Sequence, residues 1–396
     1  MTIIRRLYPL GDQGFTALYN FLFVIISSVL LDSKNFIIIN TVFLCIMFAI
    51  NLQNALVLQP FMKESVNNKI KKASISYSIK YLVRLNLIFI LFIGAYFIFS
   101  KINFMTFLLT IIWLFLLTFS EYIRRIVMVL NKWNYGFYFG LVNNLFSWIV
   151  ILVVKPTTAI AYLNLIIICL FIMLIPYLFV VLKLVKLNII SDILLVNIYK
   201  KGGLILCGSA IAYWFITGGY LLLITHFIPL DQSSDLRKIQ NMFNGIMLIL
   251  TALDNFLLVG SGYIEDKKIK IMHLLLIVSN IVYGVFVYIA INIIYPGNVS
   301  LLKLLPMWIC FYLILSIGKL WISILKSIYI TKAIFLSQFY ATIVFILLLS
   351  LIKVFAINLN SYLITFIWIP SSLVILIVCL VEKNKVFRKI LSEVNS

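Results

Sequence analysis

Residues 203–228, GLILCGSAIAYWFITGGYLLLITHFI, decide the class of fold, because these 26 positions contain no aspartate, glutamate, lysine or arginine. A helix needs about 20 apolar residues to cross the hydrocarbon core of a bilayer, whereas a strand of a membrane barrel alternates polar and apolar residues over about ten. The stretch shows no such alternation. It therefore predicts a transmembrane helix.

The whole chain shares this apolar character. Of its 396 residues, 64% are hydrophobic and 11% are charged, and the mean hydropathy is +1.15. A chain of this length cannot hide so much apolar surface in one core, so a soluble globular protein is excluded. We predict an all-α integral membrane protein with about 12 transmembrane helices, at residues 12–31, 36–60, 79–99, 102–130, 134–154, 157–185, 203–228, 239–262, 270–294, 299–326, 332–354 and 359–381.

The lysines and arginines fall mainly on one side of these spans. Twenty-four of the 32 lie in alternate connections, Arg84 lies inside a span, and seven lie in the other connections, namely Lys34, Lys101, Lys155, Arg237, Lys238, Lys303 and Lys353. Because cations are enriched on the cytoplasmic side, the pattern predicts a multi-pass protein of the bacterial inner membrane with both termini in the cytoplasm. The net charge of +20 is spread over many loops, which indicates contact with membrane lipids and not with nucleic acid.

The connections also predict the domain organisation. The longest outer connection, around Pro229 to Lys238, has about ten residues, so no extracytoplasmic domain is expected. A longer inner connection divides the chain into an N-terminal six-helix lobe at 1–190, a cytoplasmic linker at 191–202 and a C-terminal six-helix lobe at 203–396. Residues 52–58 (LQNALVL) and 253–259 (LDNFLLV) echo each other at an offset of 201. The echo indicates either an internal repeat or a chance match in a chain rich in leucine and asparagine.

Polar side chains inside three spans fall on single helical faces. They are Asp12, Thr16, Asn20 and Ser27 in the first span, Asn40, Asn51 and Asn54 in the second, and Gln240, Asn244, Thr251, Asp254 and Asn255 in the eighth. Polar groups at bilayer depth face a bundle interior or an aqueous cavity. The stripes therefore predict either one hydrophilic cavity between spans 1, 2, 7 and 8 or interhelical hydrogen bonds.

Two acids are candidates for ion coupling. Asp254 is the deepest acid, about 12 Å from the inner end of its span at helical rise, and at that depth it is expected to be paired, hydrated or protonated. It is the first candidate for binding a proton or a sodium ion. Asp12 is the second, and because it lies at the edge of the predicted first span, capping of that helix is the competing role.

Arginines near the inner surface are candidates for binding a pyrophosphate. Arg124 and Arg125 close the fourth span, and Glu121 precedes them by three and four residues, so it can pair with either. The guanidinium fork matches phosphate oxygens, although arginines here are also expected as a topogenic rim. Arg84 is a further candidate, or it snorkels to the surface. Asn143 in the fifth span offers neutral hydrogen bonds to sugar hydroxyls.

Motifs of enzyme chemistry are missing. The sequence contains no HExxH, no GxxxxGK[ST], no DxD and no Cys/His cluster, and its five cysteines are odd in number and lie in apolar stretches. We therefore predict a protein that is not an enzyme and that has no catalytic residue, metal site or cofactor.

Several motifs carry a resemblance to a known family. Asp12-Gln13-Gly14 with Asn20-Phe21, Gln53-Asn54-Ala55-Leu56-Val57 running to Pro60, Glu121-Tyr122-Ile123-Arg124-Arg125 and Leu253-Asp254-Asn255 resemble landmarks of Wzx-like polysaccharide flippases of the MOP (MATE-like) superfamily. One departure is Val259-Gly260-Ser261-Gly262, where that family suggests a Pro-Arg ending.

The resemblance implies a fold and a function. It implies two six-helix lobes in an inverted V around a central cavity that opens alternately to each side. It also implies movement of undecaprenyl-pyrophosphate-linked oligosaccharide from the cytoplasmic to the outer face, for assembly of O-antigen, capsule or exopolysaccharide. A polysaccharide polymerase and a chain-length regulator are then candidate protein partners.

Two other functions compete with the flippase. One is an ion-coupled exporter of drugs or metabolites on the same scaffold, which would need a cavity dominated by acids. The other is an integral-membrane glycan polymerase, which should show a sizeable outer loop bearing catalytic residues. The short outer connections argue against the polymerase.

Overall fold

A computed structural model of the chain describes residues 3–58, 71–129, 133–184, 207–212, 214–246, 266–327, 331–355 and 357–394. The chain divides into two compact units, Met1–Trp214 and Phe215–Ser396. The predicted linker at 191–202 lies outside the described residues, and the predicted lobe boundaries stay a prediction. All the long elements of the described residues are helices, which confirms the all-α class.

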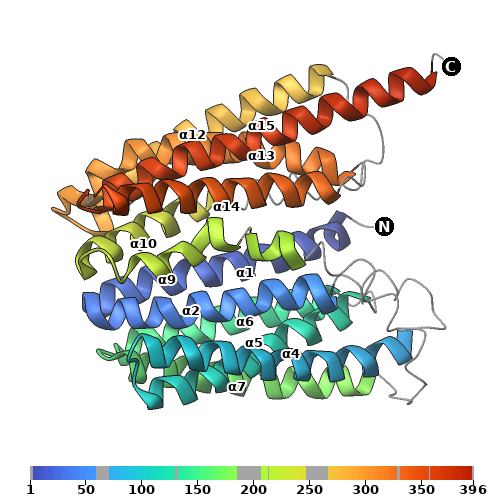
Figure 1. Cartoon of the computed structure of the whole chain (residues 1–396). Helices are drawn as coiled ribbons and strands as arrows, with labels where there is room; N and C mark the ends of the chain where they lie inside the picture. Colours follow the sequence, from blue (N-terminus) through green and yellow to red (C-terminus); the bar gives the residue numbers. More distant parts are fainter. Residues whose placement is uncertain are drawn as a thin grey trace. The chain divides into compact units, whose positions relative to one another are not determined.

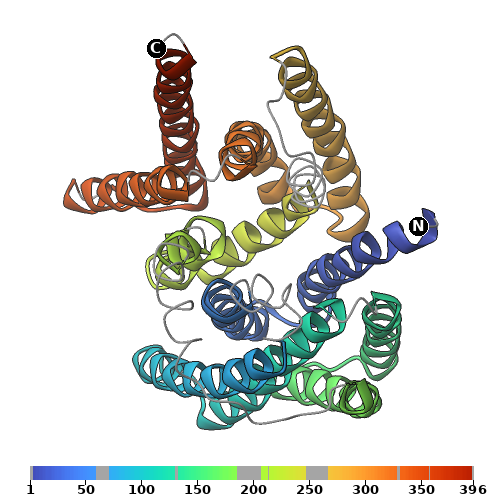
Figure 2. The ribbon, with the colours of Figure 1, turned by 90° about the vertical axis from the view of Figure 1, so that its right-hand side faces the viewer.

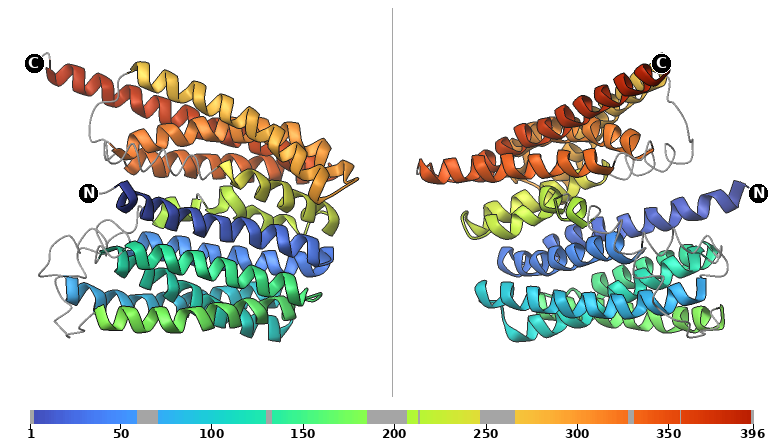
Figure 3. Two further views of the ribbon diagram at one scale, coloured as in Figure 1. Left: turned by 180° about the vertical axis from the view of Figure 1, so that it is seen from behind. Right: turned by 45° about the vertical axis from the view of Figure 1, so that its right-hand side comes forward.

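The first unit contains six long helices and one short π-helix, which Figure 1 colours from blue to green. They are α1 (Ile3–Leu30), α2 (Ser33–Gln53), η1 (Asn54–Leu58), α4 (Lys71–Phe99), α5 (Phe104–Val129), α6 (Trp133–Val154) and α7 (Ala159–Leu184). Within this unit the long helices run side by side in both views of Figure 3. The π-helix η1 continues α2 and widens its last turns at Asn54.

The second unit contains the π-helix η2 (Phe215–Gly219), α9 (Tyr220–Ile224), α10 (Leu230–Asn244), α12 (Asp266–Ile294), α13 (Val299–Ser327), α14 (Thr331–Val354) and α15 (Ser361–Val394). Within this unit α15 packs against both α13 and α14. Figure 2 turns the helices of each unit closer to end-on and separates those that overlap in Figure 1.

The predicted spans agree with the helices. Ten described helical segments are long and apolar enough to cross a membrane, and each matches one predicted span. The shorter apolar segment Gly14–Leu30 matches the first predicted span. Only the start of the eighth predicted span, 239–262, is described, because residues 247–265 lie outside the described part of the chain. The chain is therefore a multi-pass membrane protein.

Two sequence-based expectations about helix ends were wrong. Helix α1 begins at Ile3, so Asp12 lies within the helix and does not cap it. Helix α10 begins at Leu230, directly after Pro229, so the expected ten-residue outer connection is mostly helical. The segment DQSSDLRK at 231–238 is polar enough to resemble a loop, yet four of its side chains find partners within the second unit, namely Gln232, Asp235, Arg237 and Lys238. Pro229 at the helix start, with Asp231 in the first turn, favours this beginning.

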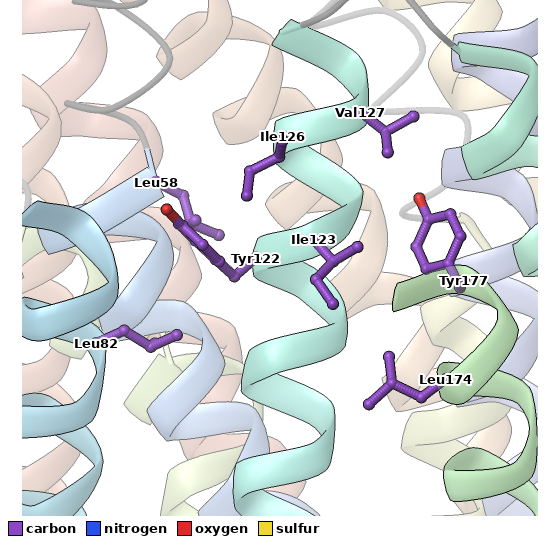
Figure 4. Packing of buried hydrophobic residues seen from close by; sticks show 8 residues of the cluster. All are labelled: Leu58, Leu82, Tyr122, Ile123, Ile126, Val127, Leu174 and Tyr177. Atoms are coloured by element: carbon purple, nitrogen blue, oxygen red, sulfur yellow. The ribbon is translucent and has the colours of Figure 1, made fainter. Parts of the chain in front are cut away.

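Buried hydrophobic residues of the first unit pack around α5. Eight buried residues form one cluster, namely Leu58, Leu82, Tyr122, Ile123, Ile126, Val127, Leu174 and Tyr177. Figure 4 shows Tyr122 on the side of Leu58 and Ile123 on the side of Leu174. In a bilayer such packing stabilises through van der Waals contact, since lipid tails are as apolar as leucine. The Tyr122 hydroxyl also lies 2.6 Å from Ser78 Oγ, a hydrogen bond that joins α4 to α5.

Candidate substrate-binding cavity

The first unit contains a half-open cavity of about 270 Å³. Its lining comes from α1, α2, η1, α5, α6 and α7, and its polar members are Thr16, Tyr19, Asn20, Asn51, Asn54, Ser120, Glu121, Arg124, Arg125, Asn143 and Asn144. Six of the residues predicted for the site are brought together here, namely Asn20, Asn51, Asn54, Arg124, Arg125 and Asn143. They come from four different stretches of the chain, so only the packing of the helices makes them neighbours.

Charged residues of α5 enter the cavity as one group. Glu121, Arg124 and Arg125 occupy positions i, i+3 and i+4 and therefore share one face of the helix. The Glu121 carboxylate lies 3.1 Å from Arg124 Nη2 and 3.0 Å from Arg125 Nη2. The side chains of Glu121 and Arg124 are each 11% exposed, and that of Arg125 is 21% exposed. One carboxylate thus neutralises two guanidinium groups only in part, and the described lining carries a net positive charge.

Arg124 is held in place from a second helix. Its Nη1 donates a hydrogen bond to the Thr16 hydroxyl of α1, while Nη2 donates to Glu121 Oε1 at 3.1 Å. These contacts fix the plane of the guanidinium group between α1 and α5. A planar group held in this way is preorganised for oxygen acceptors such as those of a phosphate.

Two adjacent asparagines of α6 differ in their hydrogen bonds. Asn144 Nδ2 donates to the carbonyls of Phe15 and Gly140, and Asn144 Oδ1 accepts from the Trp148 indole at 3.3 Å. Asn143 Oδ1 is buried and has no hydrogen-bond partner among the described residues. Leaving such a group unpaired costs about 1–3 kcal/mol. Asn144 is therefore structural, whereas Asn143 lines the cavity with its Oδ1 unpaired.

Tyr19 contributes a second unsatisfied group to the cavity. Its hydroxyl is buried and finds no hydrogen-bond partner in the described part of the chain, while its ring packs against Trp148 with centroids 4.9 Å apart. The packed ring fixes where the hydroxyl lies. Tyr19 and Asn143 thus each bring one unpaired buried oxygen to the residues that line the cavity.

The other predicted site residues lie elsewhere. Arg84 is exposed on α4 and is not part of the cavity lining. In the second unit, Gln240 Nε2 donates to the carbonyl of Thr217 in η2, and the Tyr312 hydroxyl donates to Asn244 Oδ1 at 2.7 Å. The side-chain amides of Gln240 and Asn244 therefore form hydrogen bonds that join α10 to its neighbouring helices. Asp254, Asn255 and the side chain of Asp12 lie outside the described residues, and their proposed roles stay predictions.

Some polar residues of the structure were missed by the sequence analysis. The Thr118 carbonyl accepts a hydrogen bond from Gln53 Nε2 at 2.8 Å, and the Thr118 hydroxyl accepts one from Asn86 Nδ2 at 2.8 Å. These two hydrogen bonds join α2, α5 and α4. Gln53 belongs to a motif quoted above, but no pattern in the sequence singles out Thr118 or Asn86. The buried Asp235 and Arg237 of α10 were also missed, although their helical spacing to Lys238 and Gln240 was a readable signal.

The fold defines the class of protein to which the chain is similar, namely multi-pass transporters of the MATE/MOP type. No protein-family model matches the sequence, and no curated protein matches it either. Solved structures do match. One is the inward-facing conformation of a multidrug resistance MATE family transporter of the MOP superfamily, with a TM-score of 0.67 and 12% identity over 96% of this chain and 93% of that one.

Two further solved structures support the same fold. A eukaryotic MATE transporter matches with a TM-score of 0.62 and 11% identity over 95% of this chain and 94% of that one. A MOP superfamily transporter from Pyrococcus furiosus, described as having a binding pocket of reverse polarity, matches with a TM-score of 0.57 and 11% identity over 97% and 94%. At such identities the likeness establishes the fold alone. The chain has the fold of MATE/MOP superfamily transporters, which confirms the predicted fold class.

Proposed function

We propose that the protein is a flippase that moves undecaprenyl-pyrophosphate-linked oligosaccharide from the cytoplasmic to the outer face of the bacterial inner membrane. The observation that carries the proposal is the cavity of the first unit, where two arginines, several amides and two unsatisfied polar groups meet. Arginines suit the pyrophosphate and neutral amides suit sugar hydroxyls. The polyprenyl tail would remain in the surrounding lipid.

The size of the cavity limits what it holds. Its volume is about 270 Å³. This is room for the pyrophosphate and the neighbouring part of the first sugar, and not for a whole oligosaccharide. The remaining sugars would extend beyond this cavity during transport.

The charge of the cavity weighs against the exporter of cationic compounds, which the same fold supports equally well. Glu121 is the single acid of the described lining, and both arginines already engage it. A cationic substrate would meet a net positive charge there, whereas an anionic headgroup would be attracted. Alternating access then requires only that the headgroup binds the two conformations of the transporter with different affinity.

The deciding experiment removes the charges of the cavity without leaving one of them unpaired. In the triple variant Glu121→Gln, Arg124→Gln, Arg125→Gln no ion remains in the described lining of the cavity, so the large cost of a lone buried charge there is avoided. Each lost hydrogen bond between charged groups is worth about 1.5–3 kcal/mol, so the transport rate should fall about a hundredfold or more. Lipid-linked repeat units should accumulate on the cytoplasmic face of the native host.

The matched control is Arg84→Gln, which removes an exposed arginine of the same unit. It should transport normally at the same amount of membrane-inserted protein. If the triple variant also transports normally, the arginines belong to the inner rim and the flippase proposal fails at this cavity. Normal surface glycan together with increased drug sensitivity on deletion of the protein would favour the exporter.

A further inference from the structure

A second concavity, of about 470 Å³, lies in the second unit where the ends of three helical segments meet. Its lining includes Phe227 after α9, Leu349, Ser350 and Lys353 of the last turns of α14, and Ile357 and Asn358 before α15. In Figure 1 this end of α15 is the one opposite the C-terminus. Because the candidate spans Cys207–Ile224 and Lys332–Val354 end here and Ser361–Glu382 begins here, the concavity lies at the depth of the lipid headgroups.

Hydrogen bonds fix the shape of this groove. The Ile357 amide donates to the Ile352 carbonyl at 3.1 Å, which folds the connection back over the end of α14. The next helix is tied down as well, because the Ser361 amide donates to Gln232 Oε1 of α10 at 3.1 Å. The groove is therefore held by α10, α14 and the start of α15. The groove is thus preformed before a ligand binds.

The groove contains a cation that has no acidic partner. Lys353 Nζ lies 4.9 Å from the centroid of the Phe227 ring, and in the described part of the chain no carboxylate lies within ion-pair distance of it. Lys353 is exposed, and Ser350 lies one turn earlier on the same face of α14. The lining thus combines an ammonium, a hydroxyl and the Asn358 amide with the apolar side chains of Leu349 and Ile357, which we call the apolar floor.

This chemistry is complementary to one kind of ligand. A phosphate diester suits the ammonium, glycerol hydroxyls suit Ser350 and Asn358, and acyl chains suit the apolar floor and the neighbouring Phe355 and Val354, which are 71% and 78% exposed. A zwitterionic headgroup would bring an ammonium of its own, and the described lining offers no carboxylate to receive it. We propose that the groove is a binding site for an anionic phospholipid of the surrounding leaflet, with Lys353 as the residue that selects the charge.

The positive-inside pattern places this end of the second unit on the outer side, where cations are few. The positive-inside rule therefore does not explain a lysine at this end, so we assign Lys353 a specific role. The proposal does not depend on the transported substrate, because it concerns a lipid that stays in its leaflet. Failure of the flippase proposal would leave it untouched, and the reverse also holds.

The test measures lipid binding to the full-length protein purified in detergent, by native mass spectrometry during titration with phosphatidylglycerol or phosphatidylcholine. The wild type should bind phosphatidylglycerol more tightly. Lys353→Gln should weaken that binding about fivefold, the value for one cation near a membrane surface, and should leave phosphatidylcholine unchanged. Lys353→Arg should keep the preference. The control Lys303→Gln removes another exposed outer lysine, and it should bind as the wild type does.

Two outcomes would overturn the proposal. Equal binding of both lipids by the wild type would reduce the groove to an unspecific apolar surface. Equal behaviour of Lys353→Gln and Lys303→Gln would show that no charge in this groove selects the lipid. Thermal unfolding of each variant in the same detergent identifies any loss of folded protein, which is not expected because both lysines are exposed.

Discussion

The end of α5 in the first unit and helix α10 in the second both carry a buried arginine within a polar face, yet the two regions differ in what completes them. Around Arg124 the polar groups surround a cavity, and buried Asn143 Oδ1 and Tyr19 hydroxyl oxygens stay unsatisfied by the described chain. Around Arg237 the charged groups find partners within the chain, since Arg237 Nη1 donates to Gln240 Oε1 at 3.0 Å, although the buried Ser233 and Ser234 hydroxyls of the same helix have no partner among the described residues. The comparison teaches that a polar stripe at bilayer depth indicates a site where its charged groups line a cavity, and not merely where polar groups are buried.

The same difference holds for the acids of the two regions. Glu121 pairs with two arginines at the cavity wall. Asp235 is buried in the second unit, where it accepts hydrogen bonds from Asn298 and Ser300 of the α13 end and pairs with Lys238 at 3.6 Å. Glu121 is therefore placed to exchange partners with a ligand, whereas Asp235 joins α10 to the start of α13.

The largest expected effect tests whether the polar set of α10 is structural. Asp235→Ala removes the acceptor of three groups and should lower the free energy of unfolding of the second unit by about 3 kcal/mol, as in other broken buried pairs. Thermal unfolding in detergent measures it. Asp231→Ala, an exposed acid in the first turn of the same helix, should cost at most about 1 kcal/mol. If Asp235→Ala and Asp231→Ala lowered the free energy of unfolding equally, the polar set of α10 would not be structural and its contrast with the cavity of the first unit would be lost.

An intermediate effect is expected at the carboxylate of the cavity. Glu121→Gln removes the group that competes with a phosphate for both arginines, so a short-chain prenyl pyrophosphate should bind about tenfold more tightly, at the lower end of a charged hydrogen bond. Isothermal titration calorimetry of the purified protein measures the affinity. Glu382→Gln breaks the Glu382–Lys385 pair of α15 and should leave the affinity unchanged. Weaker binding by Glu121→Gln would mean that the carboxylate positions the arginines for the ligand.

The smallest effect separates two neighbouring residues. Asn144→Ala removes hydrogen bonds that join α1 to α6 and should lower the free energy of unfolding by about 1 kcal/mol. Asn143→Ala should cost less stability, because its Oδ1 has no partner among the described residues, yet it should slow transport several-fold. Melting temperature and transport rate, measured on both variants, decide the matter. A reversed order would assign the ligand contact to Asn144.

Much of the fold followed from the sequence, and the exceptions have physical reasons. Ten apolar spans were predicted at the positions of described helices, because lipid requires a minimum length and an apolar composition of each helix that crosses it. The start of α10 was not predicted, since the polar residues at 231–238 resemble a loop until their partners in α13 and α15 are known. The echo at 253–259 falls outside the described residues and stays a prediction.

The sequence predicted which types of residue line the site, but it predicted the location of the site only in part. Arg124, Arg125 and four asparagines of the prediction share one cavity, and that cavity lies within the first unit. The predicted cavity between spans 1, 2, 7 and 8 stays a prediction. The structure splits the stripe of the second span, because Asn40 donates to its own helix at the Phe36 carbonyl while Asn51 lines the cavity three turns later.

The sequence alone determined that this chain is a helical membrane protein and which of its helices carry polar faces, because the cost of placing polar groups in lipid acts on each residue independently of the rest of the fold. Only the tertiary structure decided which polar groups are satisfied by the protein and which are left for a ligand. That distinction depends on side chains from helices far apart in the sequence, such as Thr16 and Arg124, and no local pattern encodes their meeting.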